Sequence, residues 1–394
     1  MNMIENMDKF NEFVSDIKTK NFYKEPLAWA FGRLNKGIME PDKILSVDYA
    51  VVNFKENFSS AAVILWALNE CGVNLDLTKS EFVATLDKKV VSKILEIFEF
   101  LKDEAKGQKH RNLQNLLTIK ELLDENNFCV TFLFSDDRSQ SVESVYLKLY
   151  LLSLQKVAIR SINLDGAFGL LPNVAWNEFG QPIELSWLRE NEILLKMSGK
   201  YPNIISVDKF PRFLQHIIPQ DSVRILDSSK VRMGAQLANG TTIMPGASYV
   251  NFNSGTTGKV MVEGRISSSV IVGDGSDIGG GASILGVLSG TNGNPISIGK
   301  RTLLGANSVT GIPLGDDCIV DGGIAILEGT KIFIDEKNRV LLQKSNPDFK
   351  FDREIYKAKD LSFLNGLHFR QDSQTGQITA SLSIRAIKLN ENLH

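Results

Sequence analysis

Acidic side chains are the residues best suited to proton chemistry in the glycine-rich middle of the chain. The stretch MVEGRISSSVIVGDGSDIGGGASILG, residues 261–286, contains no histidine and no cysteine. All histidines lie outside residues 225–334, at His110, His216, His368 and His394. Proton transfer in this region would therefore depend on a carboxylate. The candidates are Asp227, Glu263, Asp274, Asp277, Asp316, Asp317, Asp321 and Glu328.

Several other kinds of site do not fit the sequence. A zinc-dependent hydratase would need histidines within it, and an acyltransferase with a histidine base would need at least one. The glycines around Gly273 and Gly275 do not form a dinucleotide fingerprint, because Ile278 stands where the third glycine belongs. Cys71, Cys129 and Cys318 are widely spaced and odd in number, which argues against both a disulfide framework and a zinc site.

The elements that must position these carboxylates are indicated by a six-residue repeat. One large apolar residue and one small residue in each hexad suit a triangular coil, with the large one inside and the small one at the corner. Three hexads make one coil, so the sixteen hexads predict about five stacked coils. The apolar markers are Ile225, Val231, Leu237, Ile243, Tyr249, Val260, Ile266, Val272, Ile278, Ile284, Ile298, Leu304, Leu314, Val320, Ile326 and Ile332.

The regions on either side of the repeat lack its six-residue pattern and show helix and strand patterns instead. We expect residues 1–220 to form an α/β domain, residues 221–334 the parallel β-helix and residues 335–394 a short β-containing extension. Apolar residues from Val142 to Leu152 recur on one helical face, and residues 129–134 have the pattern of a buried strand. Two alternating runs flank Gly376, which predicts a hairpin near the C-terminus.

Composition gives no reason to expect a nucleic-acid or membrane partner. The 44 basic residues nearly balance the 46 acidic ones, so the chain carries no strong overall field. The longest apolar run, residues 61–68, is too short to span a bilayer, and the first residues lack the features of a signal peptide. We therefore expect a soluble cytoplasmic protein.

Several of these segments closely resemble the tetrahydrodipicolinate N-succinyltransferase family in its longer-chain type. They are VRMGAQLANGTTIMPGASYVNFNSGTTG, MVEGRISSS, GDGSDIGGGASILGVLSG, ISIGKRTLLGANS and LGDDCIVDGGI, with GLHFRQDS near the C-terminus. The likeness extends more loosely to SINLDGAFGLLPNVAW and VDKFPRFLQHIIP. It implies a left-handed parallel β-helix in a homotrimer. It also implies transfer of succinyl from succinyl-CoA to the amine of ring-opened tetrahydrodipicolinate, a step in lysine and diaminopimelate synthesis.

The resemblance also implies roles for particular residues. Glu263 matches the family's catalytic glutamate, as acyl-anhydride nucleophile or as general base, and Arg265 is placed to meet a carboxylate. The residues matching the succinyl-CoA site are Gly280, Ser283, Ala306, Asp321, Gly322, Gly329, Arg370, Gln371, Asp372 and Ser373. Relatives often carry a more basic C-terminal segment, so Gln371 and Asp372 weaken the case for a phosphate clamp. No metal ligand is carried over, and succinyl-CoA is expected as a co-substrate without any tightly bound cofactor.

Two alternatives remain open at the level of sequence. Another acyl-CoA-dependent N-acyltransferase, with a sugar amine as acceptor or acetyl as the transferred group, would use the same coils. A β-helix without catalytic activity is the second, although a regular rod has no need of the MVEGRIS and NFNSGTTG interruptions. On residue type alone, Glu263 and Arg265 also fit an ordinary solvated surface, and the glycines fit simple corners.

Overall fold

The structure is a computed structural model that describes residues 4–123, 127–287, 293–384 and 389. The chain divides into two compact units, Met1–Leu151 with Ile162–Pro211, and Leu152–Ser161 with Arg212–His394. The short segment 152–161 thus belongs with the C-terminal part of the chain. The three-domain division at residues 220 and 334 stays a prediction.

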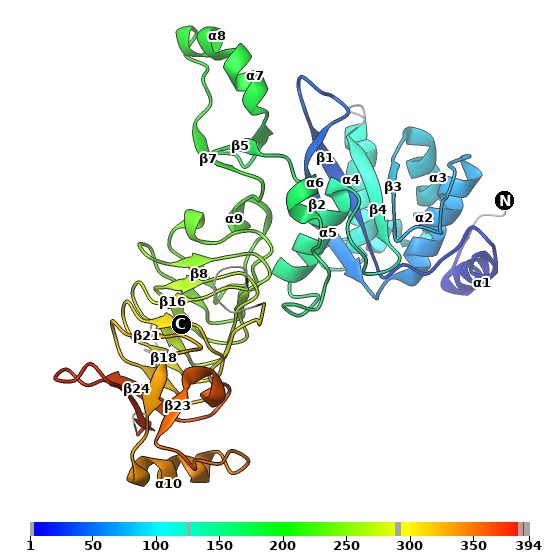
Figure 1. Cartoon of the computed structure of the whole chain (residues 1–394). Helices are drawn as coiled ribbons and strands as arrows, with labels where there is room; N and C mark the ends of the chain where they lie inside the picture. Colours follow the sequence, from blue (N-terminus) through cyan, green and yellow to red (C-terminus); the bar gives the residue numbers. More distant parts are fainter. Residues whose placement is uncertain (1–3, 124–126, 288–292, 385–388, 390–394) are drawn as a thin grey trace. The chain divides into compact units, whose positions relative to one another are not determined.

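The first unit is built on an antiparallel sheet in the order β2-β1-β4-β3 (Figure 1). Its strands are β1 (Ala28–Lys36), β2 (Ile44–Phe54), β3 (Glu81–Thr85) and β4 (Phe128–Leu133). The helices that follow or precede them are α1 (Met7–Ile17), α2 (Phe58–Glu70), α3 (Lys88–Phe98), the 3-10 turn η1 (Glu99–Glu104), α4 (Arg111–Leu122) and α5 (Val142–Ser153). The predicted strand near residues 129–134 and the predicted helix near residues 142–152 are both confirmed, as β4 and α5.

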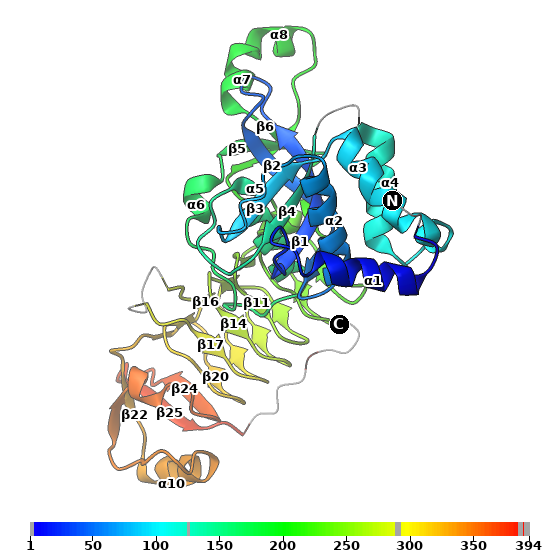
Figure 2. The same ribbon diagram turned by 90° about the vertical axis from the view of Figure 1, so that its right-hand side faces the viewer.

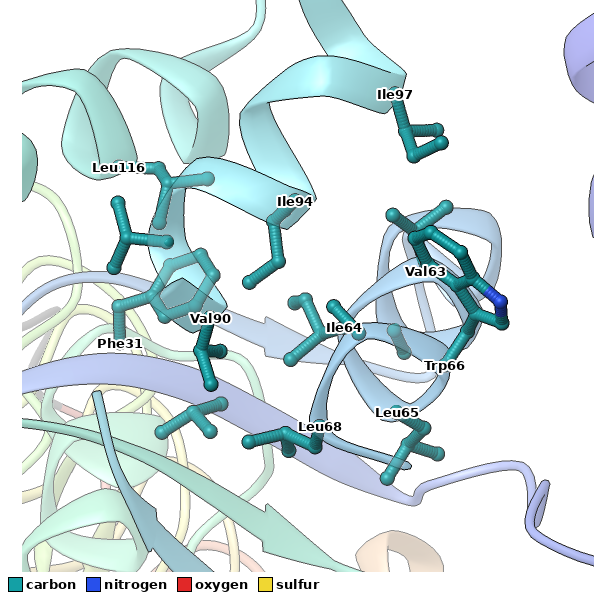
Figure 3. Packing of buried hydrophobic residues seen from close by; sticks show 14 of the residues in the cluster. Phe31, Val63, Ile64, Leu65, Trp66, Leu68, Val90, Ile94, Ile97 and Leu116 are labelled. Atoms are coloured by element: carbon teal, nitrogen blue, oxygen red, sulfur yellow. The ribbon is translucent and has the colours of Figure 1, made fainter. Parts of the chain in front are cut away.

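The core of this unit lies between the sheet and α2, α3 and α4. Figure 3 shows Ile64 of α2, Val90 and Ile94 of α3, and Leu116 of α4 packing together near Phe31 of β1. Residues 61–68 of α2 are buried on every side of the helix, which explains their unbroken apolar run. Across the described residues, no helix combines the length and the apolar character needed to cross a membrane.

The first unit also carries a small three-stranded sheet and three short helices. The sheet has the order β6-β5-β7, with β5 (Val174–Asn177), β6 (Pro182–Ile183) and β7 (Ile204–Asp208). The helices are α6 (Ala167–Leu170), α7 (Leu185–Glu190) and α8 (Glu192–Met197). Apolar side chains of α8 remain exposed, with Ile193, Leu194 and Met197 at 81%, 67% and 80%.

The second unit is the left-handed parallel β-helix, a triangular prism of two- and three-residue strands (Figure 2). It begins with α9 (Phe213–His216), β8 (Arg224–Ile225) and the 3-10 turn η3 (Ser228–Lys230). The coil strands are β9 (Thr242–Ile243), β10 (Tyr249–Val250), β11 (Gly255–Thr256), β12 (Met261–Val262), β13 (Arg265–Ile266), β14 (Ile271–Val272), β15 (Asp277–Ile278), β16 (Ser283–Ile284), β17 (Ser297–Ile298), β18 (Leu303–Leu304), β19 (Val309–Thr310), β20 (Ile319–Val320) and β21 (Ala325–Ile326).

These strands stack in register on three faces. Face one runs β8-β9-β12-β15-β18-β20, face two β10-β13-β16-β19-β21 and face three β11-β14-β17. The predicted markers Ile266, Ile278 and Leu304 are fully buried. The other residue of each of these two-residue strands is exposed or only partly buried. The hexad prediction of a coiled parallel β-structure is therefore confirmed.

The interior residues differ from the predicted markers at four positions. Val250, not Tyr249, is the buried residue of β10. In β12 the fully buried residue is Val262, two positions after the predicted marker Val260, which is buried as well. Thr256 and Thr310 complete the interior on faces three and two, although threonine was not counted as a marker. The Thr256 hydroxyl is satisfied inside the prism by the Thr241 hydroxyl at 2.6 Å, so a polar residue can take an apolar position there.

The C-terminal segment continues the prism. Its elements are β22 (Lys331–Phe333), α10 (Glu336–Ser345), β23 (Ile355–Lys357), the 3-10 turn η4 (Ala358–Leu361), β24 (Leu367–Gln371) and β25 (Ile378–Leu382). The hairpin predicted around Gly376 is confirmed as the antiparallel pair β24–β25. Its first strand also pairs in parallel with β20, so β24 forms the last rung of face one.

Candidate active site

One corner of the prism, where the chain leaves face one for face two, brings together residues from five rungs. We call it the first corner. The strand register places Val262, Ile278, Leu304, Val320 and Phe369 above one another. The residues that directly follow them in the same order are Glu263, Gly279, Gly305, Asp321 and Arg370. At about 4.8 Å per rung, the Glu263 and Arg370 positions lie about 19 Å apart along the stack.

Glu263 is a half-buried carboxylate held in place by its backbone. Its N–H donates to the Ile278 carbonyl at 2.8 Å, and its carbonyl accepts from the Gly281 N–H at 3.2 Å. Within the described part of the chain, the carboxylate itself has no hydrogen-bond or ion-pair partner. A carboxylate on a rigid backbone that makes no internal contact is available to a substrate.

Gly280 leaves the space beside this carboxylate open. A methyl group built on Gly280 would lie 3.6 Å from Glu263 Oε2 and would meet nothing else within 4 Å. By contrast, a Cβ on Gly264 would lie 2.3 Å from the Ala282 carbonyl, and one on Gly305 would lie 2.5 Å from the Gly322 nitrogen. Gly264 and Gly305 are therefore required by the coil, whereas Gly280 is not. Because Gly280 has no side chain, the space next to Glu263 stays open.

Unpaired backbone donors line the same corner. Among the described residues, the N–H groups of Gly280, Ala306 and Gly322 donate to no acceptor within the chain, while the residues around them do. These three residues follow Gly279, Gly305 and Asp321, so the free N–H groups repeat from rung to rung. Such donors can bind the carbonyl oxygen of a thioester or the amide oxygens of a long acyl carrier.

Arg265 and Ser283 lie side by side on face two, just beyond the corner. They are opposite one another in the β13–β16 register. Arg265 donates to the Ser283 hydroxyl from Nε at 3.1 Å and from Nη2 at 2.6 Å. Arg265 is exposed whereas Ser283 is buried, so the serine fixes one edge of a guanidinium whose remaining donors face solvent.

The far end of the corner holds a cluster of Asp321, His368 and Arg370. His368 Nε2 lies 2.7 Å from Asp321 Oδ1, and Arg370 Nε lies 3.5 Å from Asp321 Oδ2. The Asp321 N–H also donates to the Phe369 carbonyl at 3.1 Å. Asp321 is thus a partnered carboxylate, unlike Glu263.

The remaining predicted site residues do not join this column. Gly329 lies at the corner after β21, where the chain leaves face two, and a Cβ there would meet nothing within 4 Å. Gln371 ends β24, while Asp372 and Ser373 form the exposed turn before β25. The Asp372 carboxylate accepts from the Thr375 N–H and hydroxyl and from the Gln374 N–H, and these hydrogen bonds lower its pKa. Asp372 therefore shapes the turn.

His368 corrects one inference from the sequence. Counting residues 225–334 as the whole prism left it without a histidine, but β24 adds a rung that carries one. The alternating residues of LHFRQ predicted a strand here, but they did not show that this strand pairs with the prism. His368 lies on β24, four rungs from Glu263, so proton transfer beside Glu263 still depends on the glutamate. No group of three or more His, Cys, Asp or Glu side chains in the described residues could hold a metal ion.

Comparison with known proteins agrees with this architecture. Family models describe residues 8–169 as tetrahydrodipicolinate N-succinyltransferase N-terminal, residues 171–212 as the middle region of the same enzyme, and residues 295–328 as a hexapeptide repeat of succinyl-transferase. A 2,3,4,5-tetrahydropyridine-2,6-dicarboxylate N-succinyltransferase of Campylobacter jejuni is 58% identical over the full length of both chains, and its Helicobacter pylori counterpart is 48% identical over 98% of this chain and all of its own.

A solved structure is similar over nearly the whole chain. A crystal structure from Campylobacter jejuni, described as a 2,3,4,5-tetrahydropyridine-2-carboxylate N-succinyltransferase, superposes with a TM-score of 0.93 at 56% identity. The match covers 98% of this chain and 100% of that one. On these matches in sequence and fold, the chain belongs to the tetrahydrodipicolinate N-succinyltransferase family.

Proposed function

We propose that the chain is a 2,3,4,5-tetrahydropyridine-2,6-dicarboxylate N-succinyltransferase. It transfers the succinyl group of succinyl-CoA to the amine of the ring-opened substrate, giving N-succinyl-2-amino-6-oxopimelate and CoA in lysine and diaminopimelate synthesis. A C–N bond forms at the thioester carbon, the C–S bond breaks, and the amine loses one proton while the CoA sulfur gains one. The full-length relatives with this name support the assignment.

The first corner offers a group for each requirement of this reaction. Glu263 can accept the proton of the amine, or attack the thioester and form an acyl anhydride. The free N–H of Gly280, next to it in the corner, can stabilise the oxyanion that forms on the thioester carbonyl. Arg265 follows Glu263 by two residues and lies on the neighbouring face. From there it can bind a carboxylate of succinate or of the acceptor.

One observation carries the proposal. Glu263 is the half-buried corner carboxylate that has no partner within the described residues, and the adjacent Gly280 has a free N–H and no steric need to be glycine. Glycine costs about 0.5–1 kcal/mol relative to alanine where its flexibility is not needed. Keeping glycine at this position therefore points to a substrate beside Glu263.

The reaction can be tested by following CoA release with defined substrates. The purified chain should release CoA from succinyl-CoA in the presence of tetrahydrodipicolinate, and should do so far more slowly with acetyl-CoA or with a sugar amine as acceptor. Faster turnover with either substitute would favour another N-acyltransferase, and no acyl transfer at all would favour a non-catalytic prism. A burst of CoA release without acceptor, matched to the enzyme concentration, would assign Glu263 as nucleophile; its absence would assign it as base.

We propose also that the enzyme is a homotrimer with active sites between neighbouring prisms. The exposed apolar residues of α8, Ile193, Leu194 and Met197, form the kind of surface that a second subunit covers. Sedimentation should give a mass three times the 43.7 kDa of one chain. Ile193→Asp with Met197→Asp should weaken the trimer if α8 lies in its interface. An active monomer would contradict the proposal.

Succinyl-CoA is proposed as a freely exchanging co-substrate, with no tightly bound cofactor and no metal. Activity should be unchanged after dialysis against EDTA and gel filtration, because carboxylate and backbone groups supply the chemistry. A loss restored by a divalent ion would contradict this. Because the phosphates of succinyl-CoA prevent it from crossing a bilayer unaided, we propose that the enzyme acts in the cytoplasm, which cell fractionation can check.

A further inference from the structure

The cluster of Asp321, His368 and Arg370 contains a histidine that the proposed reaction does not use. His368 lies in β24 with 8% of its surface exposed, and its side chain reaches Asp321 on the preceding rung. The charged groups that contact its ring among the described residues are Asp321 and Arg370. The paired strand β25 places Ser381 opposite it and contributes no charge.

Hydrogen-bond chemistry fixes how this cluster is arranged. Asp321 Oδ1 lies 2.7 Å from His368 Nε2, and an ionised carboxylate can only accept, so Nε2 must carry the proton. That nitrogen then has no lone pair for the Arg370 Nε–H, which lies 3.2 Å away. Arg370 keeps only the 3.5 Å approach to Asp321 Oδ2, which is longer than a normal charged hydrogen bond. Its side chain is 59% exposed.

We propose that His368 is a positioning residue that keeps Asp321 from forming a close, two-bond pair with Arg370. By holding one carboxylate oxygen, the imidazole blocks the two-bond pairing that arginine and carboxylate otherwise form. The Nη groups of Arg370, which make no such pair, can then bind a phosphate group of succinyl-CoA. This inference rests on the proposed function, because that function supplies the phosphate-bearing ligand.

The position of the cluster fits such a role. Arg370 lies four rungs, about 19 Å, from Glu263 along the corner. Between them the corner carries Gly279 and Gly305, which have no side chains, and the free N–H groups of Gly280 and Ala306. An extended acyl carrier with its thioester at Glu263 would therefore have its charged end near Arg370. A guanidinium is well suited to a phosphate at that end.

A matched pair of substitutions at His368 tests the proposal. His368→Gln retains an amide that can reach Asp321 from about the position of Nε2, whereas His368→Leu has a similar volume but no donor. Steady-state kinetics of the full chain should show the KM for succinyl-CoA raised about tenfold in His368→Leu, the effect of losing one hydrogen bond to a charged group. The kcat should stay within about twofold, and His368→Gln should keep a KM close to that of the unmodified enzyme.

A second substitution separates positioning from packing. Adding Asp321→Asn to His368→Leu removes the charge that would capture Arg370, so the KM should return toward its original value. If His368 only filled space, the double variant would be no better than the single one. Calorimetric titration with CoA provides the same comparison without an acceptor. Should His368→Leu fail to fold, His368→Asn replaces it, since its shorter amide does not reach Asp321.

Three results would overturn the proposal: equal KM values in His368→Leu and His368→Gln, a fall in kcat without a change in KM, or a double variant no better than His368→Leu. None of these touches the reaction itself, which is judged on the unmodified chain. If the unmodified chain transfers succinyl to tetrahydrodipicolinate and the variants behave alike, the proposed function stands and the role of His368 falls.

Discussion

Glu263 and Asp321 occupy the same position on two rungs of one corner, but their surroundings are opposite. Each directly follows a face-one strand, three rungs apart. The Glu263 carboxylate makes no contact with a partner among the described residues and lies beside the bare Gly280. Asp321 is engaged by His368 and approached by Arg370. Equivalent backbone positions thus provide one carboxylate for reaction and another for setting a neighbouring charge.

The largest effect should come from removing the charge of Glu263. Glu263→Gln keeps the shape of the side chain but abolishes its basicity and nucleophilicity, so kcat should fall by at least about 10². Because the Glu263 backbone contacts are kept, the KM for succinyl-CoA should change little. Stopped assays of CoA release would measure both. Near-normal turnover in this variant would make Asp321 the better candidate for catalysis.

A smaller loss is expected when the space beside Glu263 is filled. Gly280→Ala places a methyl group 3.6 Å from Glu263 Oε2, which should lower kcat on the order of tenfold by displacing the substrate. Gly169→Ala is the matched control, since a Cβ there meets nothing within 4 Å and the residue lies in α6 of the other unit. The same assay applies to both. Equal activity in the two variants would mean that no substrate lies beside Gly280.

Neutralising the partnered carboxylate should have a weaker effect on turnover. Asp321→Asn still accepts a hydrogen bond from His368, so kcat should fall by less than about tenfold, against at least about 10² for Glu263→Gln. Comparison of kcat for the two variants at saturating succinyl-CoA measures the difference. If Asp321→Asn abolished turnover while Glu263→Gln did not, the roles assigned to the two carboxylates would be reversed.

The smallest effect is expected at a carboxylate on another corner. Asp317 pairs with Arg301 at 2.7 Å, but both side chains are about half exposed. Asp317→Asn should therefore change the free energy of unfolding by less than about 1 kcal/mol and leave kcat unaltered. Urea denaturation and the CoA assay would show this. A large loss of activity would mean that the reactive region extends beyond the first corner.

The prism was predictable because its signal is local. Most hexads contain one aliphatic residue that the pattern predicts to be buried. Ile266, Ile278 and Leu304 are buried as predicted. The pattern failed at Thr256 and Thr310, because residue type alone does not distinguish an interior threonine from a surface one. The buried Thr256 hydroxyl bonds to the Thr241 hydroxyl, whereas the buried Thr310 hydroxyl has no hydrogen-bond partner among the described residues. It also missed the shift from Val260 to Val262, because a corner that gains or loses residues changes the phase without changing composition.

The candidate site was predictable only in part. The position of Glu263 and the glycines around it came from resemblance, and the structure adds why Gly280 differs from Gly264. Whether the backbone N–H groups of Gly280 and Ala306 find an acceptor depends on which carbonyls face them. Residue type does not reveal this. His368 was missed for a similar reason, since its pairing with Asp321 joins segments 47 residues apart.

The parallel pairing of β24 with β20 limits how far the chain can be shortened from its C-terminus. A stack of coils ends in an open row of backbone donors and acceptors, which is the surface on which β-structures polymerise. On face one, β24 covers that row, and β25 then pairs with the other edge of β24. Fully buried Leu367 and Phe369 also close the apolar interior. A chain truncated before residue 366 would expose the edge of β20 and the apolar interior of the prism. Such a chain should assemble end to end into insoluble fibres.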